Sequence, residues 1–179
     1  MQLQFLKDSV MKKITFIFTV ALAMLALGNT TAKAQVQGEM GAGVNFVIGT
    51  GDDYTNYGLG VKYQWTFIDN MRLEPSFTYF FKKDMISSWD LTANVHYMFD
   101  VVPMLQAYPI VGVGMTNYHR DYDILGLQEK QDNTKFAFNF GAGMELMFSP
   151  NIGMSLEYKF RVMEDWNRSH IALGMVYKF

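Results

Sequence analysis

Two groups of residues have the types and spacing that hydrolytic chemistry needs. His119 lies close to Asp121 and Asp123, and Ser169 is followed directly by His170. A hydrolase needs a nucleophile, a general base and an orienting group within hydrogen-bond reach of one another. Both groups lie in polar segments, where histidine, aspartate and serine are also ordinary solvent-exposed residues. We therefore predict no catalytic site and keep a loop-based enzyme only as a minor alternative.

Four glycine-rich stretches share the spacing of phosphate-binding loops. Such loops hold phosphate at the N-terminus of a following helix, and no helical period follows any of the four stretches. We interpret their glycines as packing positions that make room for large neighbours. The stretches are GAGVNF (41–46), GLGVKY (58–63), GVGMTN (112–117) and GAGMEL (141–146).

Composition argues against several other kinds of site. The chain has no cysteine and a formal net charge of −2. Without cysteine there is neither a disulfide framework nor a thiolate metal site, and no dense cluster of histidine and carboxylate residues suggests another metal site. The small net charge gives no reason to expect a nucleic-acid partner. We predict no cofactor, no metal and no nucleic acid.

Apolar residues alternate with period two along most of the chain after residue 35. In the last stretch, Ile171, Leu173, Met175, Tyr177 and Phe179 all fall on one face of a strand. This period is typical of β-strands. We predict an all-β chain with eight strands, at 40–46, 57–67, 71–81, 89–99, 109–115, 136–148, 152–162 and 171–179.

The two faces of these strands differ in chemistry. The apolar face carries no charged residue, whereas the opposite face carries most of the glycines, His96 and equal numbers of acids and bases. Equal numbers favour cross-strand ion pairs, because buried charges are tolerated when they are paired. The predicted charge network consists of Glu39, Lys62, Arg72, Glu74, Asp90, Glu145, Glu157, Lys159, Arg161 and Lys178.

The size of the apolar face decides which side of the sheet lies inside. The interior of an eight-stranded barrel is only wide enough for a limited set of side chains, so the many large apolar residues would not fit there. Glycines and paired charges do fit, with the apolar face turned towards lipid. A closed barrel also satisfies every backbone N–H and C=O group within a membrane. We predict an antiparallel up-and-down transmembrane β-barrel whose lumen is filled.

The connections between strands alternate between tight turns and longer polar segments. Turns are expected at 68–70, 100–104 and 149–151, and loops at 49–56, 82–88, 118–134 and 164–169. Short turns at one end and long extracellular loops at the other are typical of outer-membrane barrels. Loops displayed by a rigid scaffold often carry function. We predict a surface loop for recognition of host, phage or neighbouring cells that includes Tyr118, His119, Arg120, Asp121, Tyr122 and Asp123.

The N-terminal region has the pattern of a secretory signal peptide. Lys12 and Lys13 precede an apolar run over 14–27, and Ala32-Lys33-Ala34 is a small-x-small cleavage site. The run is short for a membrane-spanning helix, which needs about 20 apolar residues. We predict a signal peptide over 1–34, with Met11 as an alternative start, and a barrel domain over 35–179.

The end of the chain carries the pattern that suggests a family. Gly174, Tyr177 and Phe179 resemble the C-terminal signal through which the outer-membrane assembly machinery recognises its clients. With the signal peptide and eight alternating strands, the whole mature chain resembles the small outer-membrane β-barrel family, which includes the OmpA transmembrane domain, OmpX and the opacity proteins. This resemblance implies a Gram-negative outer membrane, with lipid and the assembly machinery as partners.

The resemblance and the filled lumen together favour a structural or adhesive monomer that is not an enzyme. One alternative is a narrow or gated porin-like channel for small solutes. A large aqueous channel belongs to barrels of about 16 strands or more, so we expect no general-diffusion pore. A loop-based lipid-modifying enzyme or protease is the weaker alternative.

Overall fold

A computed structural model describes residues 37–51, 54–83, 86–124, 127–163 and 167–179. Every regular element in these ranges is a β-strand, as the period-two pattern predicts. The strands are β1 (Met40–Gly51), β2 (Tyr54–Ile68), β3 (Met71–Lys83), β4 (Ile86–Tyr97), β5 (Phe99–Val102), β6 (Leu105–Ile124), β7 (Leu127–Met147), β8 (Ile152–Met163) and β9 (Arg168–Lys178).

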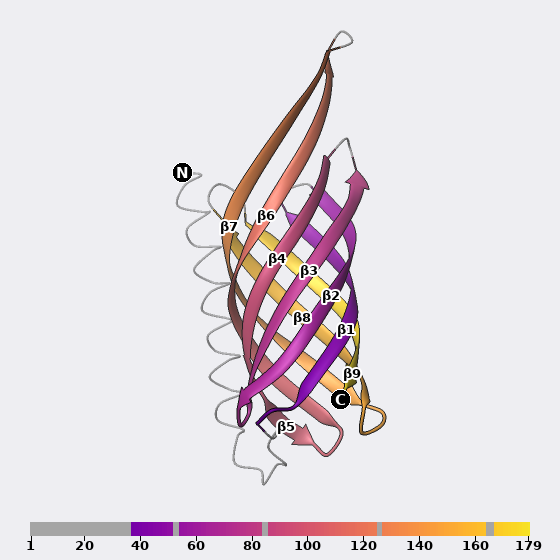
Figure 1. The fold of residues 1–179 in the computed structure, drawn as a ribbon, viewed down its shortest axis with the longest axis vertical. Helices are drawn as coiled ribbons and strands as arrows, with labels where there is room; N and C mark the ends of the chain where they lie inside the picture. Colours follow the sequence, from indigo (N-terminus) through magenta and orange to yellow (C-terminus); the bar gives the residue numbers. More distant parts are fainter. Residues whose placement is uncertain (1–36, 52–53, 84–85, 125–126, 164–166) are drawn as a thin grey trace, which may run out of the picture.

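The strands form one closed antiparallel sheet (Figure 1). Apart from β4 and β5, each strand pairs with the next along the chain; β9 pairs with β1, and β4 pairs with β6. β4 and β5 are consecutive parts of one wall strand, because both pair with β6 in the same register: His96 lies opposite Ile110, and Phe99 lies opposite Ala107. The predicted eight-stranded up-and-down barrel is therefore confirmed.

Two prolines explain two of the interruptions in the hydrogen-bond ladder. The β4–β5 break lies opposite Pro109, and the β2–β3 pairing omits Pro75 together with the neighbouring pair Gln64 and Glu74. Proline has no N–H to donate to the opposite strand. The Gln64 side chain instead donates to Glu74 Oε2 at 2.9 Å. A side-chain contact on the lumen side thus bridges the gap between β2 and β3.

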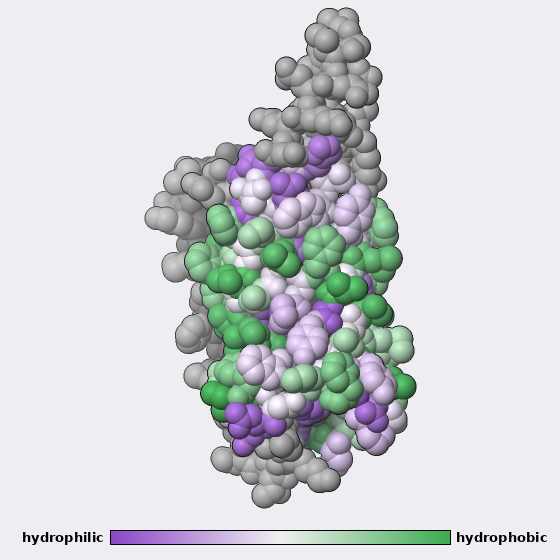
Figure 2. Space-filling model, in the orientation of Figure 1, coloured by the Kyte–Doolittle hydropathy of each residue, from purple (hydrophilic) through white to green (hydrophobic). Residues whose placement is uncertain are grey.

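The barrel wall is apolar outside and polar inside. Along β9, Leu173 and Met175 are about half exposed, whereas Ala172 and Val176 on either side of them are almost fully buried. Figure 2 shows hydrophobic residues across the middle of the visible face and hydrophilic ones gathered towards its two ends. An apolar surface of this extent is not stable in water, and it suits hydrocarbon.

The two ends of the barrel differ. The tight turns and the C-terminus lie at one end, called the turn end below, and β6 and β7 rise past the other strands at the opposite end, called the hairpin end (Figure 1). The turn between β2 and β3 uses Asn70 with a φ of 64°, a left-handed conformation that asparagine adopts more readily than most residues.

The prediction of a loop over 118–134 is wrong, because the described residues of this segment form the ends of strands β6 and β7. β6 and β7 continue as a paired ribbon from Tyr118 opposite Asn133 to Ile124 opposite Leu127. A two-stranded ribbon in water can be polar on both faces. Its sequence therefore loses the apolar alternation that marks a strand in the wall while its backbone pairing continues. The residues assigned to a surface loop are in fact part of strand β6.

The predicted signal peptide over 1–34 lies outside the described residues. It therefore stays a prediction. Within the described ranges, no helix is both long and apolar enough to cross a membrane.

Whether the apolar face points towards lipid can be tested by placing an arginine on it at each of two depths in the membrane. Leu173→Arg places a guanidinium on the outer face midway along β9, and should lower the free energy of unfolding in lipid vesicles by about 2–4 kcal/mol. Val102→Arg at the turn end is the matched control, since Val102 is similarly exposed but close to water. Urea midpoints in vesicles measure both changes. Equal losses for both variants would contradict a lipid-facing wall.

Candidate functional site

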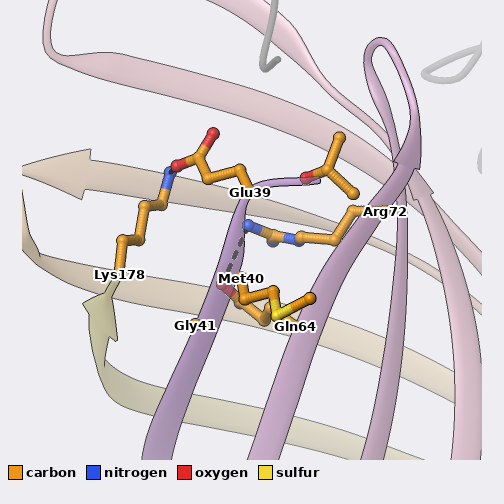
Figure 3. A pocket seen from close by; sticks show the side chains of 7 residues that line it. Glu39, Met40, Gly41, Gln64, Arg72 and Lys178 are labelled. Carbon is orange, nitrogen blue, oxygen red and sulfur yellow. Dashed lines mark hydrogen bonds and ion pairs between the residues drawn. The ribbon is translucent and has the colours of Figure 1, made fainter. Parts of the chain in front are cut away.

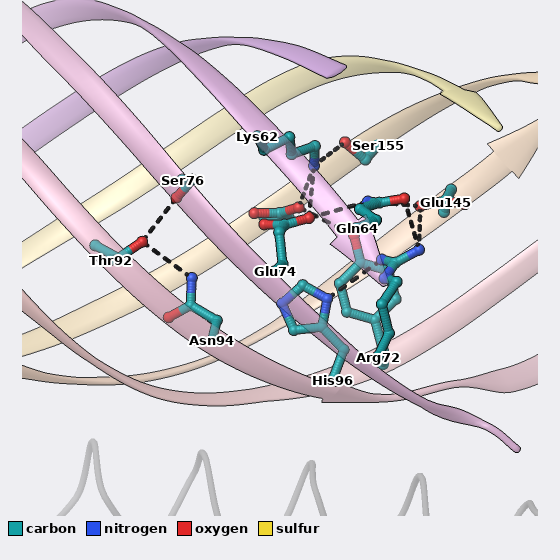
Figure 4. A network of polar contacts seen from close by, with 12 residues as sticks. Lys62, Gln64, Arg72, Glu74, Ser76, Thr92, Asn94, His96, Glu145 and Ser155 are labelled. Atoms are coloured by element: carbon teal, nitrogen blue, oxygen red, sulfur yellow. Dashed lines mark hydrogen bonds and ion pairs between the residues drawn. The ribbon is translucent and has the colours of Figure 1, made fainter. Parts of the chain in front are cut away.

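The barrel lumen holds a network of buried charges centred on Lys62 (Figure 4). Lys62 Nζ lies 2.6 Å from Glu157 Oε1 and 3.3 Å from Glu74 Oε2, and it donates to Ser155 Oγ at 2.9 Å. Lys159 Nζ lies 3.0 Å from the other Glu157 oxygen. Each carboxylate therefore faces at least one ammonium group, which offsets the cost of taking both charges out of water.

Arg72 forms a second centre nearer the turn end. Its Nη1 donates to Glu145 Oε2 at 2.8 Å and to Gln64 Oε1 at 3.1 Å. Its Nη2 lies 3.2 Å from His96 Nδ1, and because a guanidinium can only donate, His96 Nδ1 is the acceptor and the ring is neutral. The guanidinium also lies 4.9 Å from the Tyr108 ring centroid.

Lumen glycines make room for the large side chains of this network. A Cβ atom at Gly143 would lie 2.5 Å from Tyr108 Cε2, and one at Gly58 would lie 2.9 Å from Phe80 Cδ1. The Tyr108 ring fills that space and stacks on His96, with centroids 4.7 Å apart. These contacts support the interpretation of the glycines as packing positions rather than phosphate loops.

The turn end of the lumen is closed where the first and last wall strands meet. Lys178 Nζ lies 3.2 Å from Glu39 Oε1 and 3.1 Å from Glu145 Oε1. Beside them is a shallow pocket, lined in part by Arg72 and Gln64, that has no room for a water molecule (Figure 3). The two bases in its lining, Arg72 and Lys178, are paired with Glu145 and Glu39, so it offers no excess charge with which to bind a charged solute.

A neutral layer lies next to the charged network. Ser76 and Thr92 share a hydrogen bond of 2.7 Å, Asn94 Nδ2 donates to Thr92 Oγ1 at 3.3 Å, and Asn139 Nδ2 donates to Asn94 Oδ1 at 2.9 Å. All four side chains are buried or half-buried. Together with the charged residues they fill the cross-section of the barrel.

Nearer the hairpin end lies a group of residues built around arginines. Arg161 pairs with Asp90. Arg168 donates to Asn56 Oδ1 at 2.8 Å and to the Tyr118 hydroxyl at 3.3 Å. Sequence analysis did not predict a lumen role for Arg168 or Tyr118, because both fell in segments assigned to loops. The signal for Arg168 was its spacing from His170 and Ala172, which continues the lumen face of β9.

Every member of the predicted charge network makes an ion pair within the barrel. Two of the pairs join strands that are not neighbours in the wall: Arg72 pairs with Glu145 and Arg161 with Asp90. Sequence alone could not assign partners, because the contacts cross the lumen between strands far apart in the wall. The ion-paired residues are Glu39, Lys62, Arg72, Glu74, Asp90, Glu145, Glu157, Lys159, Arg161 and Lys178.

The candidate hydrolytic residues are not brought together. Ser169 Oγ lies 3.0 Å from the Tyr158 hydroxyl on the outer face, whereas His170 is buried in the lumen beside Phe80. Successive residues of a strand point to opposite faces, so Ser169 and His170 cannot act as nucleophile and base. His119 lies within β6, opposite Asp132 of β7. Among the described residues, no group of histidine and carboxylate side chains is placed to hold a metal ion.

The C-terminal residues complete the wall of the barrel. Gly174 lies on the lumen face opposite Asn45 and Ser155, and Tyr177 is half exposed on the outer face. The Phe179 amide donates to the Met40 carbonyl at 3.0 Å, which closes the seam between β9 and β1. Recognition of Gly174, Tyr177 and Phe179 by the assembly machinery stays a prediction.

The charge network can be tested at Lys62. Lys62→Met leaves Glu74 and Glu157 facing each other without their shared cation, and should lower the free energy of unfolding by about 3–5 kcal/mol. The double variant Lys62→Met/Glu74→Gln removes one of the facing charges and should recover most of that loss. Denaturant midpoints of the refolded proteins give both values. A single variant as stable as the wild type would show that the network is not paired as described.

Comparisons with known proteins agree with this architecture. Residues 17–179 match the family model described as "Outer membrane protein beta-barrel domain", and no curated protein matches the chain. Neisserial surface protein A is similar in structure, with a TM-score of 0.63, 13% identity, and coverage of 79% of this chain and 96% of that one. Ail, the attachment invasion locus protein of Yersinia pestis, has a TM-score of 0.59, 20% identity, and coverage of 80% and 100%.

A third solved structure is also similar in fold. The N-terminal β-barrel domain of Pseudomonas aeruginosa OprF has a TM-score of 0.54 and 18% identity, and the match covers 81% of this chain and all of that one. At these identities the solved structures show a shared fold, and the family model supplies the assignment. The chain belongs to the outer membrane protein beta-barrel domain family and is an outer-membrane β-barrel of a Gram-negative cell.

Proposed function

We propose that this protein is a surface-recognition protein of the adhesion type, with a lumen that does not conduct. The observation that carries the proposal is the β6–β7 hairpin. Within the described residues, β4 pairs with β6 as far as Arg120, and β8 pairs with β7 as far as Ala137. Beyond these points the two strands pair with each other as far as Ile124 and Leu127. The barrel thus displays a ribbon that the wall itself does not need.

The hairpin end is assigned to the cell exterior. Small outer-membrane barrels have short periplasmic turns and longer extracellular connections, and the chain ends at the opposite, turn end (Figure 1). The fold is shared with Ail, whose name describes attachment and invasion and which has been crystallised with the heparin analogue sucrose octasulfate. By analogy, we place the ligand-binding part of this chain on the hairpin, with a host, phage or neighbouring-cell surface as its partner.

The filled lumen supports this proposal over a channel. Lys62, Glu74, Glu157, Arg72 and Glu145 are each at most 4% exposed and are held by ion pairs that cross the lumen. A solute would have to break several of these contacts at once. The remaining parts of the proposal are a cleaved signal peptide over 1–34, assembly through the C-terminal strand, and a monomer without enzymatic activity.

Shortening the hairpin should abolish recognition and spare the barrel. Replacing residues 120–131 with Asn-Gly puts a two-residue turn on the paired positions His119 and Asp132. Bacteria that express the shortened chain should be retained on cultured epithelial cells at the level of an empty-vector strain. Asn117→Ala/Thr134→Ala keeps the hairpin and removes only an exposed hydrogen bond, so it is the matched control. Full retention with the shortened chain would refute the assignment.

Planar-bilayer recordings test the closed lumen. The purified, refolded wild-type protein should give no steady conductance, because paired side chains fill the barrel at the level of Lys62 and Arg72. A general-diffusion porin prepared in the same way serves as the positive control. A steady, ion-selective current from the wild-type protein would favour the alternative of a narrow solute channel.

A further inference from the structure

A tripeptide at the hairpin end has the sequence of an N-glycosylation site. Asn167, Arg168 and Ser169 match the pattern Asn-x-Ser/Thr, in which x is any residue except proline. The other match in the sequence is at residues 29–31 (Asn-Thr-Thr), within the predicted signal peptide. In the chain after residue 34, Asn167 is therefore the single asparagine with this pattern.

The structure gives Asn167 the surroundings that such a site needs. A glycan is bulky and strongly hydrated, so its acceptor must be an exposed side chain in a connection at the surface. Asn167 is exposed and lies outside the regular strands, directly before β9, which begins at Arg168. Asn56 and Asn139, by contrast, are buried in the lumen. Asn167 thus lies in the connection between β8 and β9, at the hairpin end.

The serine hydroxyl of the tripeptide is engaged in the folded barrel. Ser169 Oγ lies 3.0 Å from the Tyr158 hydroxyl, and Ser169 pairs with Phe160 of β8 and Thr50 of β1. Residues two apart in an extended chain point to the same side, so an unpaired chain can present the Asn167 amide and the Ser169 hydroxyl to one enzyme. Transfer of a glycan therefore has to precede the pairing of β9, while the chain crosses the periplasm.

We propose that Asn167 is a glycosylation site that is modified in the periplasm before the barrel closes. The donor is of the class of oligosaccharides carried on a lipid diphosphate. The Asn167 amide nitrogen attacks C1 of the first sugar, so that a C–N bond forms and the C1–O bond to the diphosphate breaks. The lipid diphosphate leaves, and the amide nitrogen gives up one proton to a base of the transferase. No oxidant or reductant takes part.

A glycan at this position would stand close to the base of the β6–β7 hairpin. Arg168, the next residue, donates to the Tyr118 hydroxyl at 3.3 Å. Tyr118 lies in β6, two residues before the pairing with β4 reaches Arg120. The site rests on the outer-membrane location of the chain and does not depend on what the hairpin binds.

Mass spectrometry of the protein from the outer membranes of its own cells tests the site. Trypsin cleaves after Arg161 and Arg168, and the resulting peptide 162–168 should carry the added mass of a glycan. Asn167→Gln should remove that mass. Asn133→Gln, at an exposed asparagine of the hairpin that lacks the pattern, is the matched control and should keep it. Recovery of peptide 162–168 at its unmodified mass alone would overturn the proposal.

Three further variants separate the tripeptide from the hydrogen bond that its serine makes. Ser169→Ala keeps Asn167 but removes the hydroxyl, and should abolish the modification, whereas Ser169→Thr should restore it. Tyr158→Phe removes the same hydrogen bond without touching the tripeptide, and should leave the glycan in place. Peptide 162–168 has the same sequence in all three and is measured from whole cell envelopes, so the comparison does not require a folded barrel. A glycan that persists in Ser169→Ala, or is lost in Tyr158→Phe, would overturn the assignment.

Discussion

Backbone N–H and C=O groups find no hydrogen-bond partner in hydrocarbon, and this constraint shapes the whole molecule. It requires a sheet with no open edge, which the pairing of β9 with β1 provides. Because a strand alternates its side chains between two faces, closing the sheet also sorts the sequence into a lipid-facing set and a lumen-facing set. Where Pro75 interrupts the ladder, a Gln64–Glu74 side-chain contact bridges the gap.

The lumen follows from the same constraint. Eight wall strands leave a narrow interior, so its contents must be either small or mutually paired. Glycines such as Gly143 admit Tyr108, and the acids of the turn-end network each meet a base. At the hairpin end Arg161 and Arg168 lie opposite each other across β8 and β9, and each reaches partners on other strands: Arg161 pairs with Asp90, and Arg168 donates to Asn56 and Tyr118.

Most of the wall could be predicted from the sequence, since period-two alternation is strongest where one face meets lipid. The charged residues of the lumen could be predicted for the same reason, because they share strands with the apolar stripe. Their partners could not, as Arg72 and Glu145 lie on strands that meet only across the lumen. The β6–β7 hairpin was taken for a loop, because alternation fades where both faces of the ribbon meet water. The lumen positions of Tyr118 and Arg168 were missed because both residues fell in segments assigned to loops.

The orientation of the two faces is best tested by a cysteine scan along β8, which is practical because the chain has no cysteine of its own. Single spin labels at positions 154 to 159 would be compared in lipid vesicles for their accessibility to dissolved oxygen, which concentrates in hydrocarbon. Labels at Met154, Leu156 and Tyr158 should be accessible, and labels at Ser155, Glu157 and Lys159 should be protected. The opposite phase, or no alternation, would contradict a barrel with its apolar face in lipid and its charges within.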